Sequence, residues 1–153
     1  MRKLLFAGLL AFAAVPLVYG VAFATPVVGM PTITTFLRST LAEPVHFNED
    51  RIKFQTKGAA DVISQKITWN AGDGSGWHTH PGVVLVSVDS GVLNYQTSDC
   101  VIRQYRRGES FVESGMEAAR VVPSSSASTV YITYVVPQGA AAREDAPAPS
   151  CAG

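Results

Sequence analysis

Apolar and polar residues alternate along most of the chain beyond residue 31, with the two-residue period of a half-buried strand. The alternation is clearest over 61–69, where Ile63, Gln65, Ile67 and Trp69 share one face. Further stretches of strand-like composition occupy 32–40, 45–58 (with a turn at 48–50), 83–88, 92–97, 100–105, 110–113 and 129–136. Gly, Pro, Asn and Asp punctuate these stretches. The pattern predicts many short strands and hence an all-β sandwich or barrel.

The first 24 residues follow a different pattern. Arg2 and Lys3 precede a continuous apolar run, which closes with the small-x-small sequence Ala22-Phe23-Ala24. This arrangement predicts a signal peptide over 1–24 that is cleaved before Thr25, and therefore a secreted or extracytoplasmic protein without membrane attachment after cleavage. The alternative is a retained membrane anchor, because the apolar run is long enough to span a bilayer.

The charge balance excludes one class of partner. The full chain of 153 residues carries 12 basic and 12 acidic side chains, and loss of the leader removes two basic ones. The mature chain then has a net charge of −2, and its charges are scattered rather than gathered in a basic patch. We therefore expect no nucleic-acid binding. The length suits a single domain.

The mature chain divides into a lead segment over 25–31, a β-barrel over 32–136 and an Ala/Pro-rich tail over 137–153. The two cysteines, Cys100 and Cys151, lack the spacing of metal ligands. In an oxidising compartment an even number of cysteines favours a disulfide, which here would pin the tail to the barrel. Two free thiols are the alternative.

The stretch "GSGWHTHPG", residues 74–82, contains two of the three histidines in the chain. Residues two apart on a strand point to the same side, so His78 and His80 can present both imidazoles to one metal ion. Neutral imidazole suits Mn, Fe, Zn, Ni or Cu ions. The same spacing also fits two ordinary histidines that line a barrel. The third histidine, His46, is expected at the surface.

Glycines frame the histidine pair in a recognisable way. Gly72 precedes His78 by five intervening residues, His80 follows after one more, and Gly91 closes the next strand at a turn. This spacing resembles the first motif of the cupin superfamily, G-x5-H-x-H-x3,4-E-x6-G.

A second segment supports the same resemblance. In "YRRGESFVESGMEAARVV", Gly108 and Gly115 match the two glycines of the second cupin motif, which leads to a third histidine. The likeness extends from about Thr32 to Cys151 and is to small secreted bacterial cupin-domain proteins of unknown function. It implies a single-domain cupin fold, that is, a double-stranded β-helix or jelly-roll barrel.

The sequence departs from the superfamily at two ligand positions. The metal-binding glutamate would fall at Val84 or Leu85, and the third histidine near Ala118. Two of the usual four ligands are therefore left. Glu113 and Glu117 flank the vacant histidine position, and either could serve as a third ligand. Glu113 is the poorer candidate, because the "FVE" stretch also matches relatives that keep the histidine.

Three functions remain open. The first is a binding module whose pocket, lined by the histidine pair, holds a small ligand or one weakly bound divalent metal ion (Mn, Fe, Zn, Ni or Cu). The second is a metal-dependent enzyme of oxidoreductase or dioxygenase type, and the third a structural or interaction protein with a vestigial site. No catalytic residue, no further cofactor and no identity for the small molecule follow from the sequence. Open sheet edges make a homodimer possible.

Overall fold

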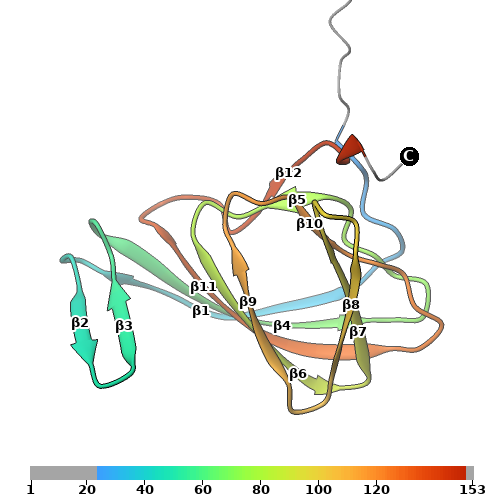
Figure 1. The fold of residues 1–153 in the computed structure, drawn as a ribbon, viewed down its shortest axis with the longest axis horizontal. Helices are drawn as coiled ribbons and strands as arrows, with labels where there is room; N and C mark the ends of the chain where they lie inside the picture. Colours follow the sequence, from blue (N-terminus) through green and yellow to red (C-terminus); the bar gives the residue numbers. More distant parts are fainter. Residues whose placement is uncertain (1–23, 151–153) are drawn as a thin grey trace, which may run out of the picture.

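Two antiparallel sheets of five strands each enclose the interior of the protein (Figure 1). The structure is a computed structural model that describes residues 24–150. Residues 1–23 and 151–153 lie outside the described part, and with them nearly all of the predicted signal peptide and Cys151. Leader cleavage and the Cys100–Cys151 disulfide therefore stay predictions. Within 24–150, no helix has the length and apolar character needed to cross a bilayer.

The strands are short and follow one another closely along the chain. Their bounds are β1 (Thr32–Leu41), β2 (His46–Glu49), β3 (Ile52–Gln55), β4 (Ala60–Trp69), β5 (His78–Thr79), β6 (Val83–Ser90), β7 (Val92–Thr97), β8 (Ile102–Arg106), β9 (Ser110–Ser114), β10 (Ala119–Val121), β11 (Ser128–Pro137) and β12 (Glu144–Asp145).

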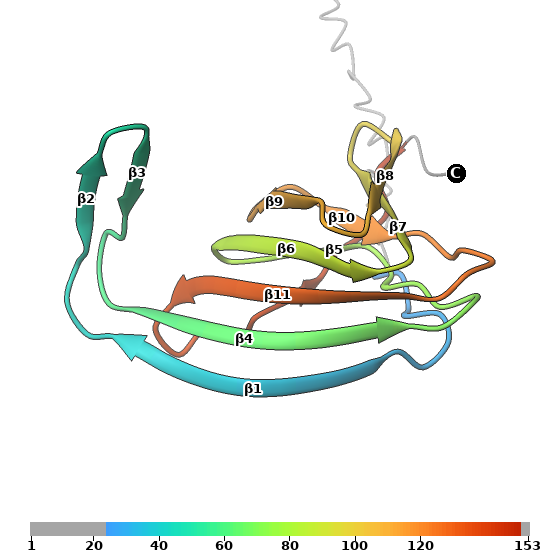
Figure 2. The ribbon, with the colours of Figure 1, turned by 90° about the horizontal axis from the view of Figure 1, so that it is seen from below.

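Strand order shows how the chain is wound. The larger sheet has the order β1-β4-β11-β6-β9 and the smaller one β12-β5-β10-β7-β8, so the chain passes repeatedly from one sheet to the other. β2 and β3 form a separate hairpin that stands away from the barrel in both views (Figures 1 and 2). Crossing between two packed antiparallel sheets is the jelly-roll arrangement. The predicted all-β, jelly-roll architecture is confirmed.

Alternation along the central strands places the core between the sheets. In β6, Val84, Val86 and Val88 are buried, whereas Val83 and Leu85 between them are exposed. β4 and β11 alternate in the same register, so their inward positions extend the same apolar layer. Burial of such side chains is the main favourable term in folding. The two-residue period seen in the sequence is therefore the period of the core.

The predicted strand bounds agree with the structure to within about three residues, the largest difference being in the hairpin, where the predicted range runs to 58 and β3 ends at Gln55. β8 begins at Ile102 rather than at Cys100, because Cys100 adopts a positive φ of 59° in the preceding turn. Three short strands were missed: β5, β10 and β12. Each has only two or three residues, which is too few for a two-residue period to stand out.

A buried carboxylate fastens the edge of the larger sheet. Asp61 on β4 accepts hydrogen bonds from Arg38 and Thr40 of β1 and from the backbone N–H of Gly139, just after β11. The Gly139 amide, the Thr40 hydroxyl and the Arg38 guanidinium together lower the pKa of Asp61 to about 2. This contact also fixes where the C-terminal tail leaves the barrel.

The burial pattern predicts that the same substitution, Ile to Ala, lowers the free energy of unfolding by different amounts at two positions. Ile63 is 3% exposed in the core and Ile102 is 51% exposed on β8. We expect Ile63→Ala to lower the free energy of unfolding by about 2–5 kcal/mol, because it leaves a cavity. Ile102→Ala should cost less than about 1 kcal/mol. Urea unfolding followed by tryptophan fluorescence measures both, and equal costs would contradict the assigned core.

Candidate metal centre

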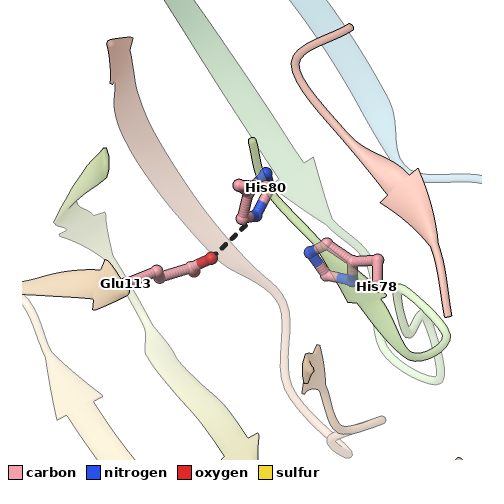
Figure 3. Close-up of side chains that lie close together, drawn as sticks. All are labelled: His78, His80 and Glu113. Carbon is pink, nitrogen blue, oxygen red and sulfur yellow. Dashed lines mark ion pairs between the residues drawn. The ribbon is translucent and has the colours of Figure 1, made fainter. Parts of the chain in front are cut away.

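Three side chains that can each offer a metal ligand meet inside the barrel (Figure 3). His78 lies on β5, His80 follows it directly, and Glu113 comes from β9. All three residues are buried, with 7%, 5% and 8% of their surface exposed. Their ligand atoms lie within 4.8 Å of one another. The cluster therefore has the size of a first coordination shell.

Strand geometry brings the two histidines to the same side. Thr79 between them is half-buried and points away, as the alternation predicts. β5 is short, but it pairs with a neighbour on each side: His78 lies opposite Ala119 of β10 and opposite Asp145 of β12. Two flanking strands thus hold a two-residue strand in place.

Glu113 reaches the same cavity through the register of the larger sheet. It lies directly opposite Val84, and both face inward, whereas their neighbours Leu85 and Val112 form an outward-facing pair. Val84 is one of the two positions at which the cupin motif would carry its glutamate. The carboxylate missing from β6 is therefore replaced by one on the adjacent strand.

Close backbone contact lets β9 approach the histidines. The backbone N–H of His80 donates a 2.7 Å hydrogen bond to the carbonyl of Gly115. A Cβ atom on Gly115 would collide with the carbonyl oxygens of His80 and Gly82. Glycine is thus required at this position for the end of β9 to pack against the histidine segment.

Hydrogen bonds fix the tautomer of each imidazole. Nδ1 of His80 lies 2.6 Å from the carbonyl oxygen of Ala142, and Nδ1 of His78 lies 3.0 Å from that of Gly76. A carbonyl can only accept, so Nδ1 carries the proton in both rings. The Nε2 atom of each neutral ring is left with a free lone pair. Carbonyl groups that orient metal-binding histidines in this way are a recurrent feature of metal sites.

The contact between His80 and Glu113 requires a shared proton or a bound cation. Nε2 of His80 lies 2.8 Å from Oε2 of Glu113, yet Oε2 has no hydrogen-bond partner among the described residues. With the imidazole proton on Nδ1, two lone pairs face each other in a buried cavity, which is unfavourable. A proton on Nε2 or a metal ion bound by both atoms relieves this repulsion. The donor set therefore fits a cation.

Burial keeps His78 neutral. Desolvation lowers the pKa of this imidazole to about 4, although the hydrogen bond to Gly76 acts in the opposite direction. Nearby Tyr134 has its pKa raised, chiefly by burial and then by the charge of Glu113. At neutral pH, His78 is thus a neutral imidazole whose Nε2 can bind a metal ion, and Tyr134 is a neutral phenol.

A small cavity of about 200 Å³ lies over the cluster. Apolar side chains from both sheets form most of its wall, joined by the polar groups of Trp69, Tyr134, Gln65, Ser75 and Arg143. Ala142 and Arg143 come from the tail, which crosses the barrel mouth and continues into β12. Arg143 is held there by a 2.8 Å hydrogen bond to the carbonyl of Ser75 and by an ion pair with Asp145.

The structure separates the two proposed third ligands. Glu113 lies in the cluster, whereas Glu117 is exposed and hydrogen-bonded to Ser98 and Ser114. Of the two candidates, Glu113 is the one that occupies an inward position, on β9. His46 is exposed on β2, as expected.

The vacant histidine position is also displaced by one residue. Ala119, rather than Ala118, is the buried residue of β10 that lies opposite His78. An alanine side chain here leaves space beside the histidine pair and offers no ligand atom.

Several cavity residues were not recognised from the sequence. The alternation places Trp69 on one face of its strand with Ile63 and Ile67, but it does not connect the indole with the site. Arg143 and Ala142 belong to a tail with no periodic pattern, so only the hydrogen bonds of the folded chain show their role. The nearest usable signal was the charged Arg-Glu-Asp triplet within an otherwise Ala/Pro-rich segment.

Comparison with known proteins gives likeness of fold only. No protein-family profile and no curated protein matches the sequence. Among solved structures, the chain is similar to a cupin-like protein from Thermotoga maritima, with 18% identity over 57% of this chain and 65% of the other and a TM-score of 0.49. It is also similar to a conserved Klebsiella pneumoniae protein with a double-stranded β-helix domain, with 18% identity, 69% and 86% coverage and a TM-score of 0.48.

A third similar structure is a DMSP lyase from Ruegeria pomeroyi, with 11% identity and a TM-score of 0.49. The match covers 54% of this chain, but the chain spans only 42% of the length of the lyase. Identities and TM-scores at this level carry no argument about activity, substrate or ligand.

The neutral state of His78 predicts a dependence of stability on pH. The folded imidazole has a pKa of about 4 and the unfolded one about 6.5, so the unfolded chain takes up the proton first as the pH falls. We expect chelator-treated protein to lose about 1–2 kcal/mol of unfolding free energy between about pH 7 and about pH 5.

Urea titrations at several pH values measure this loss. His78→Gln should remove most of it, and His46→Gln, on the exposed hairpin, should leave it intact. An unchanged pH dependence in the His78 variant would contradict the assignment.

Proposed function

We propose that this protein, a single-domain chain with the cupin fold, binds one divalent transition-metal ion through His78, His80 and Glu113 and accommodates a small ligand in the cavity beside it. One observation supports this proposal most strongly. A buried imidazole Nε2 and an unpartnered carboxylate oxygen lie 2.8 Å apart, with the imidazole proton held on the other nitrogen. A shared cation satisfies both atoms.

The donor set favours transition metals over calcium or magnesium. Two imidazoles and one carboxylate form the ligand set of several catalytic zinc sites and of the facial triad of non-haem iron sites. Calcium and magnesium prefer oxygen ligands alone. The sequence and the geometry are consistent with Mn, Fe, Zn, Ni or Cu. A bound ion of this kind would supply Lewis acidity at the cavity floor.

The chain's own residues prepare the site for the ion. The carbonyls of Gly76 and Ala142 hold the two Nδ1 protons, so both Nε2 atoms are free to bind without a change of tautomer. Burial keeps His78 unprotonated, which removes the competing proton at neutral pH. The cavity of about 200 Å³ limits the ligand to a small molecule.

A metal-dependent enzyme, of oxidoreductase or dioxygenase type, is the second candidate. It is favoured by the number of ligands, because three protein ligands leave coordination positions open for water or substrate. Within the described residues we find no separate acid–base pair beside the cluster. We therefore rank a binding function above a catalytic one. The predicted signal peptide would place either function outside the cytoplasm.

Metal binding can be tested directly. After complete chelation, the protein should take up one equivalent of Zn²⁺ or Co²⁺ per chain, measured by equilibrium dialysis and elemental analysis. His78→Ala, His80→Ala and Glu113→Gln should each weaken binding by at least about 100-fold, because each removes one of three ligands. For Co²⁺, the visible spectrum reports the coordination directly.

Two controls match these variants in chemistry. Glu117→Gln removes a carboxylate four residues from Glu113, and His46→Ala removes the remaining histidine, yet neither side chain lies in the cluster. Both should bind metal as the wild type does. Failure of the wild type to bind any of Mn, Fe, Ni, Cu and Zn would refute the proposal and leave a vestigial site.

A further inference from the structure

The outward face of the larger sheet is almost free of charge. Along the outward positions of β1, β4, β6, β9 and β11, Lys66 and Asp89 are the two charged side chains, and most of the others are Val, Leu, Ser, Thr or an aromatic residue. The outward positions of the smaller sheet include Arg106 and the hydrogen-bonded pair Asn94 and Gln104. Depletion of charge is typical of the centre of a protein–protein interface.

Large apolar side chains are exposed on this same face. Val83, Leu85 and Val112 are 49%, 46% and 63% exposed near one end of the sheet. Toward the other edge, Phe36 stacks on Tyr131, with 57% and 44% of their surfaces exposed. These side chains lie on four strands of one sheet face, with Ser87 and Thr133 between the two groups.

The hairpin β2–β3 carries a second apolar surface. Phe47 and Phe54 lie directly opposite each other across the hairpin, and Ile52 shares their face, opposite the charged Glu49. They are 57%, 38% and 70% exposed. Neither strand pairs with any other described strand, and the hairpin projects from the end of the larger sheet (Figure 2). An isolated two-stranded hairpin is only marginally stable, so contact with a partner surface would stabilise this arm.

The arm and the sheet enclose an open groove. Phe54 lines one wall, and Val83, Leu85 and Val112 line the other, with a volume of about 880 Å³ between them. Lys53 and Lys57 also line the groove, on the side of the arm. The groove is thus separate from the cavity at the histidines. It is bounded by the same two apolar surfaces that the chain leaves uncovered.

We infer that a second copy of this chain occupies the groove, with the hairpin of each protomer seated against the outward sheet face of its partner. A projecting arm and an apolar receiving face on one side of the same molecule form a self-complementary surface. A closed two-fold dimer requires a self-complementary surface. In such a dimer, the arm of each protomer docks on the sheet face of the other.

The exposed area matches that of a stable dimer. Eight large apolar side chains contribute: Phe36, Phe47, Ile52, Phe54, Val83, Leu85, Val112 and Tyr131. At 38–70% exposure they amount to roughly 800 Å² per protomer, the size of a standard stable interface. The low charge of the receiving face also favours an apolar partner surface such as this arm over a charged ligand.

Sedimentation velocity and light scattering test the dimer on protein purified from an exporting host. We expect twice the mass of the mature chain at micromolar concentration. Phe54→Lys on the arm and Leu85→Glu on the sheet face should each raise the dimer dissociation constant at least about 30-fold, because each buries an unpaired charge. Ile102→Glu, on the smaller sheet, is the matched control and should remain dimeric.

Mixing the two variants distinguishes arm-to-face docking from other pairings. In a mixed dimer, one half of the interface joins the introduced lysine to the introduced glutamate, and the other half keeps both natural residues. We expect the mixture to recover the dimer although each variant alone is monomeric. The inference would be overturned by a monomeric wild type or by a mixture that stays monomeric. It would also be overturned by a dimer that survives Phe54→Lys, which is the result expected if the protomers pair through the open edge of β1.

Discussion

The site depends on one contact between two atoms that repel each other unless a positive charge is present. Nε2 of His80 and Oε2 of Glu113 lie 2.8 Å apart in a buried cavity, and the proton of the imidazole is held elsewhere. A fold tolerates such a contact only when the surrounding structure determines it strongly. Two contacts supply this support here. The carbonyl of Gly115 accepts a hydrogen bond from the backbone N–H of His80, and the carbonyl of Ala142 accepts one from its imidazole.

The tail is therefore part of the site as well as of the fold. Its carbonyl at Ala142 sets the tautomer of His80, its strand β12 flanks His78, and Arg143 closes the cavity. A change that loosened the tail would free the Nδ1 proton and let His80 turn. The hydrogen bond from Gly139 to Asp61 anchors the start of the tail, and the predicted disulfide would hold its far end.

The sequence carried enough information for the fold and for half of the site. Nine of the twelve strands could be predicted from their composition and alternation, and the histidine pair followed from its spacing and its glycine frame. Glu113 was undervalued because its role depends on register: only pairing with Val84 shows that it faces inward. The tail residues could not be found at all, since hydrogen bonds across more than sixty positions of sequence leave no local pattern.

Register also connects the interior site with the outward face. Along β6 and β9, the pair Val84–Glu113 faces the cavity, and the adjacent pair Leu85–Val112 faces the groove. A slip of one residue would exchange the two surfaces, removing the carboxylate from the histidines and burying the groove wall. Any partner seated on Leu85 and Val112 thus opposes that slip. Assembly through the outward face would stabilise the position of Glu113 inside the barrel without touching the site itself.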